Sequence, residues 1–190
     1  MTLLKFKLLT VLMFLISLSG NAWADDYTDT IKIFKEAGAS SGFFGNSYGY
    51  AVFPTIGKGG VGVGGAYGKG RVYKGGAYVG NTSMTQLTVG WQLGGQGYSQ
   101  IIFFQDKRAF DEFTTGKFEF GAQATAVAIT AGVSAGASTT GTSATASGGK
   151  HDASTRGSYN KGMATFSVAK GGLMYEAAIG GQKFSYKRKK

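Results

Sequence analysis

The sequence predicts a β-rich α+β fold: a curved antiparallel sheet or barrel-like core, with an N-terminal helix and one further short helix. Apolar residues between positions 49 and 104 alternate with small or polar ones at the two-residue period of strands. Two segments, residues 25–39 and 106–114, have instead the period of amphipathic helices. The 33 glycines against a single proline favour extended chain that packs closely or curves strongly.

Residues 1–24 have the pattern of a secretion signal. Two lysines precede an apolar run over residues 8–18, and the triplet Ala22-Trp23-Ala24 has small residues where signal peptidases cut. The apolar run is shorter than the roughly 20 residues that a membrane-spanning helix needs. We therefore expect cleavage before Asp25, export of the protein, and a single domain over residues 25–190.

The first half of that domain should consist of one helix followed by strands. Tyr27, Ile31 and Phe34 share one face of the helix, and small residues around Phe43 and Phe44 then break the pattern and leave these two rings exposed. The Ile-Ile-Phe-Phe run of the last strand should be buried on both faces. Strands are expected at residues 50–53 (leading into Pro54), 61–68, 71–79, 84–93 and 99–104, with turns at Gly80-Asn81 and Gly94-Gly95.

The second half begins with a short helix over residues 106–114. Asp106 occupies its N-cap position, and Phe110 and Phe113 lie three residues apart on one face. Residues 121–149 are nearly uncharged and rich in Ala, Ser, Thr and Gly. Their β-branched residues favour strands over 120–138, whereas 139–157 should form a loop. Two closing strands are expected within 159–186, before the basic end Lys187–Lys190.

The residue types that catalysis needs are scarce. The chain has no cysteine, which excludes disulfides and thiolate metal sites, and its one histidine, His151, lies in a polar loop. Asp111 and Glu112 are adjacent on a helix, so they should point to different faces as solvated charges. The glycine spacing of residues 60–65 matches a dinucleotide fingerprint, but strand alternation stands where that motif needs a helix. We expect neither an enzyme nor a bound cofactor or metal.

The charge distribution favours an anionic partner. The net charge is +10, or +8 without the signal segment, and residues 37–105 contain no carboxylate. If residues 57–74 form a hairpin, its cations should gather at one rim of the sheet, and each would contribute about 1 kcal/mol near an anionic membrane. Ordinary solubilising charge remains an alternative interpretation. The residues expected to bind lipid are Lys58, Lys69, Arg71 and Lys74, assisted by Lys32 and Lys35, with Phe43 and Phe44 inserting apolar contacts.

Several sequence blocks together resemble the SYLF-domain family over about residues 27–186. The resemblance implies a lipid-binding module without enzymatic activity. Eukaryotic members of that family bind phosphoinositides, some yeast members also bind and bundle actin, and bacterial members are exported. The blocks are Gly49-Tyr-Ala-Val-Phe-Pro54, Gly57-Lys-Gly-Gly60, Gly64-Gly-Ala-Tyr-Gly68, Gly90-Trp-Gln-Leu-Gly-Gly95, Tyr98-Ser99, Ile101-Ile-Phe-Phe104, Phe118-Glu-Phe-Gly121 and Gly171-Gly-Leu-Met-Tyr-Glu176.

The chain resembles the bacterial branch most, because it has a signal segment and no SH3 or FYVE domain. This implies a location in a bacterial periplasm or at the periphery of the cell envelope, with an anionic lipid or membrane surface as partner. Actin is not expected as a partner, and neither is nucleic acid, because an exported chain has little access to it. Two other functions remain open: a structural or protein-interaction module of the envelope, and an integral outer-membrane β-barrel, disfavoured by the glycine-rich faces and basic end.

Overall fold

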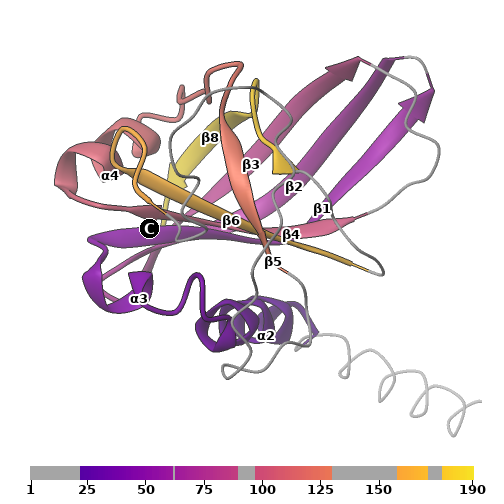
Figure 1. The fold of residues 1–190 in the computed structure, drawn as a ribbon. Coiled ribbons are helices and arrows are strands. Elements are labelled where there is room, and N and C mark those ends of the chain that lie inside the picture. Colours follow the sequence, from indigo (N-terminus) through magenta and orange to yellow (C-terminus); the bar gives the residue numbers. More distant parts are fainter. Residues whose placement is uncertain (1–21, 62, 90–96, 130–157, 171–176) are drawn as a thin grey trace, which may run out of the picture.

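The computed structural model of the protein describes residues 22–61, 63–89, 97–129, 158–170 and 177–190. It is rich in strands, with few and short helices, which confirms the predicted fold class (Figure 1). The elements are α2 (Ala22–Glu36), α3 (Phe43–Asn46), β1 (Gly49–Val61), β2 (Val63–Lys74), β3 (Ala77–Val89), β4 (Tyr98–Phe104), α4 (Lys107–Thr114), β5 (Thr125–Ile129), β6 (Met163–Ala169), β7 (Ala177–Ala178) and β8 (Lys183–Arg188).

The strands form one curved, open sheet in the order β7-β5-β6-β4-β1-β2-β3-β8. The neighbours pair in antiparallel fashion, as expected, except that β5 and β6 run parallel. In Figure 1, strands β1, β2 and β3 extend beyond the rest of the sheet at the upper right. The long hairpin of β1 and β2 therefore has one end in the body of the protein and one end projecting from it.

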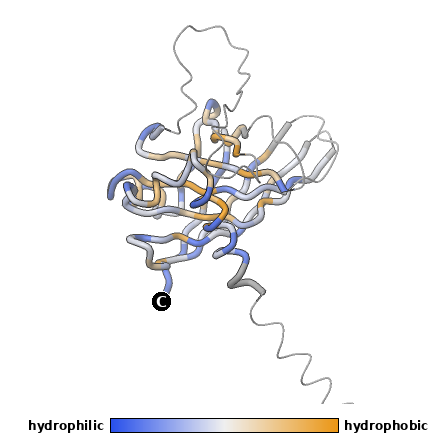
Figure 2. The backbone as a smooth tube through the Cα atoms, turned by 60° about the horizontal axis from the view of Figure 1, so that its bottom comes forward, coloured by the Kyte–Doolittle hydropathy of each residue, from blue (hydrophilic) through white to orange (hydrophobic). Residues whose placement is uncertain are grey.

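Two apolar clusters lie on opposite faces of the sheet, because neighbouring residues of a strand point to opposite sides. Helices α2 and α3 cover one face, where Val52 and Phe103 pack, and α4 covers the other, where Phe53 and Phe104 pack. All seven residues of β4 are buried, which confirms the prediction for its Ile-Ile-Phe-Phe run. Figure 2 accordingly shows the most hydrophobic segments in the middle of the sheet. Each large side chain buried there stabilises the fold by roughly 1.5–3 kcal/mol.

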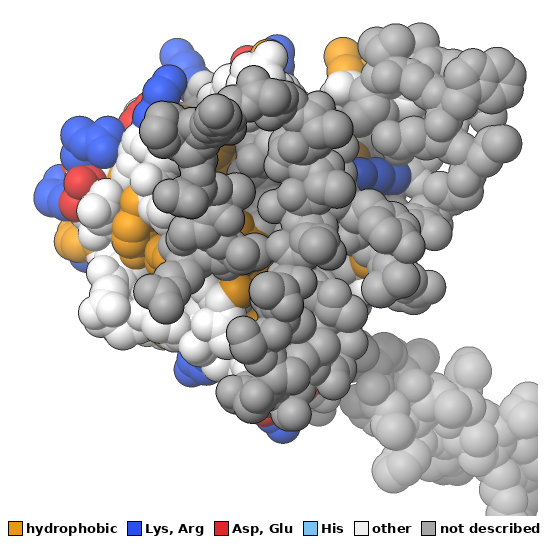
Figure 3. Space-filling model, in the orientation of Figure 1, with side chains coloured by type: hydrophobic (Ala, Val, Ile, Leu, Met, Phe, Trp, Pro, Cys, Tyr) orange, Lys and Arg blue, Asp and Glu red, His pale blue; other side chains and the backbone are white. Residues whose placement is uncertain are grey.

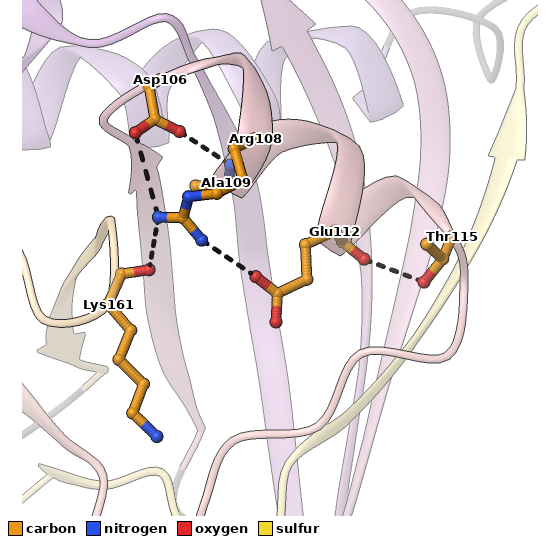
Figure 4. Close-up of polar contacts among 6 residues, drawn as sticks. All are labelled: Asp106, Arg108, Ala109, Glu112, Thr115 and Lys161. Carbon is orange, nitrogen blue, oxygen red and sulfur yellow. Dashed lines mark hydrogen bonds and ion pairs between the residues drawn. The ribbon is translucent and has the colours of Figure 1, made fainter.

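Both longer helices form in the predicted regions, although α2 spans residues 22–36 and not 25–39. In α2, Tyr27 and Phe34 point into the core, whereas Lys32 and Lys35 are exposed. In α4, the carboxylate of Asp106 accepts a hydrogen bond of 2.9 Å from the backbone N–H of Ala109, and this contact is the predicted N-cap (Figure 4). Helix α3 was not foreseen, because four residues are too few to show a helical period.

The turn between β2 and β3 lies at Gly75-Gly76, so the expected turn at Gly80-Asn81 is wrong. Gly75 and Gly76 have φ values of +54° and +81°, a conformation that glycine adopts without steric cost. Gly80 lies inside β3 opposite Val72 and has a different role. A Cβ atom at Gly80 would lie 2.5 Å from the ring of Tyr186, so glycine is needed there for close packing.

Strand β1 continues through Pro54 rather than ending there. The pairing register of β1 with β2 shifts between Val52 and Thr55, and such a bulge accommodates a proline that has no N–H to donate. The hydroxyl of Ser99 donates a 2.7 Å hydrogen bond to the carbonyl of Pro54. At the far end of the hairpin Val61 pairs with Val63, so the glycines of residues 60–65 surround a turn and not the start of a helix. This excludes a dinucleotide fingerprint there.

Several sequence predictions concern residues outside the described ranges. These are the turn at Gly94-Gly95, the strand at 130–138, the loop at 139–157 and the position of His151. Within the described ranges, no helix combines the length and the apolar character that crossing a membrane requires.

Candidate ligand-binding face

The four cations of the β1-β2 hairpin are spread along its length. Lys58 lies opposite Ala66, close to the projecting turn, whereas Lys74 lies opposite Gly49 at the other end of the hairpin. Lys69 and Arg71 lie between these extremes. The expectation that the four gather at one rim is therefore wrong, because only Lys58 lies near the Val61–Val63 pair at the end of the hairpin and the other three follow at increasing distance along β2.

Strand alternation also divides these cations between the two faces of the sheet. Lys69 and Arg71 lie on the face that continues from the side covered by α2, which we call the outer face. Lys58 and Lys74 lie on the opposite, inner face, with Ala66 and Val72. The residues that share the outer face, by the register of β2, β3 and β8, are Tyr67, Lys69, Arg71, Asn81, Ser83, Thr85, Leu87, Lys183, Ser185 and Lys187.

The outer face gains further cations that the sequence interpretation did not include. Strand β8 contributes Lys183 and Lys187, and the ammonium of Lys170 donates a 2.6 Å hydrogen bond to the hydroxyl of Thr55. The alternation Lys183, Ser185, Lys187 was a signal for this face. Lys183 pairs with Glu119 at 3.6 Å. Within the part of the chain that the structure describes, Lys69, Lys170 and Lys187 form no ion pair.

The cations around α4 are neutralised instead. Lys107 pairs with Asp111, and Arg108 lies 3.4 Å from the carboxylate of Glu112 (Figure 4). In Figure 3 the blue side chains at the left, next to α4, are accordingly mixed with red ones. This confirms that Asp111 and Glu112 are solvated surface charges. The outer face therefore differs from the surface of α4, because among the described residues Lys69, Lys170 and Lys187 have no such partner.

Arg71 holds α2 against the sheet. Its guanidinium carbon lies 4.2 Å from the ring centroid of Tyr27 in α2 and 5.1 Å from that of Tyr78 in β3. Burial raises the pKa of Tyr27, and the positive charge of Arg71 opposes this rise. A guanidinium in contact with two aromatic rings is stabilised by about 0.5–1 kcal/mol for each ring. The Arg71 side chain is thus already held by the rings of Tyr27 and Tyr78, although its positive charge still contributes to the electrostatic field of the outer face.

The inner-face cations also contact aromatic rings. The ammonium of Lys58 lies 4.9 Å from the ring centroid of Tyr98, and that of Lys74 lies 5.0 Å from that of Tyr48. Burial lowers the pKa of Lys58, because removal of water disfavours its charged form. These two lysines face away from the outer face and would not meet a flat partner docked there.

Phe43 and Phe44 are half-buried, so the expectation of an exposed pair is wrong. The ring centroid of Phe43 lies 5.4 Å from that of Phe103 and 5.1 Å from that of Phe166. Phe44 packs against Tyr50 and Phe103 at 5.2 Å and 4.9 Å. Helix α3 turns both rings toward the core cluster beneath α2, where they bury more apolar area than they would in solvent.

The lysines of α2 lie on its solvent side. Lys32 is 3.9 Å from Glu36 one turn later, and the ammonium of Lys35 lies 5.5 Å from the ring centroid of Phe44. Lys35 is thus the α2 cation whose charge has no acidic partner in the described ranges.

A hollow of about 350 Å³ lies where α2 meets the outer face of the hairpin. Thr55, one of its lining residues, receives the hydrogen bond from Lys170 described above. In the described part of the chain, no three His, Cys, Asp or Glu side chains come close enough together to hold a metal ion. The residues that line the hollow are Asp26, Tyr27, Pro54, Thr55, Gly57, Tyr67, Gly68 and Lys69.

A comparison with known families gives a match. A family model described as "Las17-binding protein actin regulator" (Ysc84) matches residues 85–190, which is more than half of the chain. This is the SYLF-domain family that the sequence blocks resemble, a family of lipid- and actin-binding domains that is not known for catalysis. No curated protein matches the chain. The matched segment contains Lys170, Lys183 and Lys187, whereas β1 and β2 precede it.

Proposed function

This chain belongs to the Las17-binding protein actin regulator family, and from that premise we propose that it is a non-enzymatic, exported module that binds anionic phospholipid headgroups peripherally. The observation that carries the proposal is the set of outer-face cations without ion pairs among the described residues. Lys69, Lys170 and Lys187 come from three different segments of the chain and have no carboxylate partner there. A surface with such unneutralised charge attracts an anionic bilayer.

The expected binding strength follows from simple addition over this face. Each lysine near an anionic membrane contributes about 1 kcal/mol, so three to five of them give appreciable but salt-sensitive binding. Between these cations the outer face has the small side chains of Ser83, Thr85 and Ser185, which let headgroups approach the sheet closely.

Apolar contact comes from the projecting end of the sheet in this proposal. Leu87 is 85% exposed and Tyr67 is 51% exposed, both on the outer face. Burying an exposed leucine in the acyl boundary would add up to about 2 kcal/mol. The sequence predicts this role for Phe43 and Phe44, but these rings are half-buried and pack against the core cluster beneath α2.

Vesicle sedimentation tests the proposal, using the protein isolated after expression of the full chain. We expect little binding to phosphatidylcholine vesicles, binding that increases with phosphatidylglycerol content, and release at high salt. The triple substitution Lys69→Gln, Lys170→Gln and Lys187→Gln should abolish most of this binding. The matched control Lys107→Gln, Arg108→Gln and Lys117→Gln removes the same charge around α4 and should leave most of it. Equal loss in both triple variants would show that net charge alone acts, and would overturn the assignment of the face.

Export and the choice of partner need separate measurements. The N-terminus of the protein recovered from a bacterial envelope fraction should be Asp25, and retention of residues 1–24 would contradict cleavage.

We also propose that actin is not its partner, since an exported protein would not meet it. Sedimentation with actin filaments at physiological salt should leave the protein in the supernatant, and co-sedimentation would refute this part of the proposal.

A further inference from the structure

The hollow beside α2 contains side chains of both charges. Lys69 lines one side, and Lys170 reaches the rim through its hydrogen bond to Thr55 at 2.6 Å. Asp26 lines the side formed by α2, and its carboxylate has no ion pair in the described part of the chain. A site for a simple anion would be weakened by Asp26, because a like charge opposes the binding of phosphate.

The remaining wall is aromatic and apolar. Tyr67, which is half-exposed, and Pro54 both line the hollow. The faces of exposed tyrosine rings attract ammonium groups, and Tyr27 already contacts the cation of Arg71 in this way. The hollow therefore offers two cationic groups for an anion, together with a carboxylate and an aromatic ring for a cation.

We propose that this hollow binds a phospho-amine group such as phosphoethanolamine, with the phosphate at Lys69 and Lys170 and the ammonium at Asp26 and Tyr67. This inference rests on the proposed lipid-binding function and names a headgroup class for one part of the same face. The ligand is zwitterionic, so it satisfies both charges of the hollow, which neither phosphate nor a simple amine does. The volume of about 350 Å³ lies at the small end of the range for ligand sites, which suits a compact headgroup.

Gly57 allows the hollow to be filled without disturbing the fold. It lines the hollow in β1, opposite Tyr67, and a Cβ atom added to it would have no neighbour within 4 Å. Gly59 lies two residues further on the same strand face, is equally unobstructed, and is not among the lining residues. Valine suits an exposed strand position. The substitution Gly57→Val should therefore block the hollow, and Gly59→Val is its matched control.

In the first measurement, O-phosphoethanolamine, inorganic phosphate and ethanolamine are each titrated into the protein isolated after expression of the full chain. Changes in the backbone amide NMR shifts report the binding of each compound. We expect O-phosphoethanolamine to bind at least tenfold more tightly than either of the other two. Gly57→Val should abolish this binding, whereas Gly59→Val should keep it. Asp26→Asn should make inorganic phosphate bind more tightly than O-phosphoethanolamine, because the substitution removes both the repulsion of phosphate and the attraction for the ammonium group. Equal affinity for phosphate and O-phosphoethanolamine in the wild type would overturn the proposal.

The second measurement distinguishes a lipid headgroup from a free phospho-amine. Vesicles containing phosphatidylglycerol are compared with and without phosphatidylethanolamine. If phosphatidylethanolamine strengthens vesicle binding and Gly57→Val removes this effect, the ligand is the lipid headgroup. If only the soluble compound binds, the ligand is a free phospho-amine. If neither probe binds in a manner sensitive to Gly57→Val, the proposal is wrong. Loss of phosphatidylglycerol binding in the triple lysine variant tests the proposed function separately, because Gly57→Val leaves those charges in place.

Discussion

The side-chain amides of Gln100 and Gln182 form two reciprocal hydrogen bonds inside the protein, of 2.9 Å and 3.1 Å. Neither residue is exposed to solvent, and Gln182 also donates a 3.0 Å bond to the hydroxyl of Tyr98. Gln100 lies in the middle of β4, and Gln182 immediately precedes β8. The pair thus connects the centre of the sheet to the start of its edge strand.

The two amides should contribute to stability as a pair, because removing either one leaves the other buried without its partner. The substitution Gln182→Leu leaves the buried amide of Gln100 without a partner, and we expect a loss of about 2–3 kcal/mol in the free energy of unfolding. The double variant Gln100→Leu/Gln182→Leu leaves no orphaned amide at these positions, so its loss should be smaller than the sum of the two single losses. Urea denaturation of the four proteins measures this coupling. Strictly additive losses would mean that the pair contributes packing only.

Glycines of the hairpin should differ sharply in their tolerance of a methyl group. A Cβ atom at Gly70 would lie 2.7 Å from the ring of Phe53 and 2.8 Å from the carbonyl oxygen of Val52, whereas the space at Gly59 is open. We expect Gly70→Ala to destabilise the protein by about 1–3 kcal/mol. Gly59→Ala should be neutral or slightly stabilising, because it restricts the unfolded chain. The midpoints of thermal unfolding give this comparison, and similar midpoints for both variants would contradict the close packing at Gly70.

The sequence predicts those elements whose signals are local. The burial of β4 follows from its continuous apolar run, and the start of α4 follows from Asp106 at the cap position. The turn at Gly75-Gly76 could not be chosen over Gly80-Asn81 by composition, since both pairs are common in turns. What decides is a tertiary contact: Gly80 packs against Tyr186, which is distant in sequence. The parallel pairing of β5 with β6 is likewise invisible in the pattern of either strand.

The candidate site was predictable only in part. The absence of carboxylates from residues 37–105 points to all four hairpin cations alike, but only Lys69 and Arg71 share the outer face, whereas Lys58 and Lys74 lie on the inner one. The same argument does not find Lys170 or Lys187, because contacts between distant segments bring them to this face. Lys170 reaches it through its hydrogen bond to Thr55, and Lys187 through the pairing of β8 with β3. Phe43 illustrates the opposite error, since glycine-rich surroundings suggest exposure but the ring reaches Phe103. The amino-acid sequence shows where charge is concentrated along the chain, but the pairing of strands decides which charged side chains share a face of the sheet.

The N-cap of α4 should account for a measurable part of the stability. Removing the Asp106 carboxylate leaves the N–H of Ala109 without its partner, so Asp106→Ala should lower the free energy of unfolding by about 1 kcal/mol. Asp106→Asn keeps an acceptor oxygen, so its free energy of unfolding should fall by only a small fraction of the loss in Asp106→Ala. Chemical denaturation of both variants measures the difference. An equally large loss in Asp106→Asn would point instead to the 3.9 Å ion pair with Arg108.

Stability should decrease at alkaline pH because of the partly buried Tyr50. Burial, together with the neighbouring Tyr73, raises the pKa of Tyr50 from 10.0 to about 12. The folded state therefore holds this proton more tightly than the unfolded state, and the stability present below pH 10 is lost as the pH rises toward 12. After allowance for partial exposure we expect about 1 kcal/mol from this ring. Tyr50→Phe should flatten the stability curve over this pH range, and an unchanged slope would contradict the assignment.

Arg71 should act on the position of α2 rather than on lipid directly, in contrast to Lys69 on the same strand face. Arg71→Lys keeps the charge but loses the planar contacts with Tyr27 and Tyr78, so the amides of α2 should exchange hydrogen faster and the protein should lose about 1 kcal/mol of stability. Its binding to phosphatidylglycerol vesicles should stay close to that of the wild type. Lys69→Gln should do the reverse, weakening vesicle binding without changing exchange in α2. Hydrogen exchange by mass spectrometry, measured beside vesicle sedimentation, separates the two effects. If Arg71→Lys left exchange in α2 unchanged, the guanidinium would not be what holds the helix, and packing of Phe34 in the core would have to hold it alone.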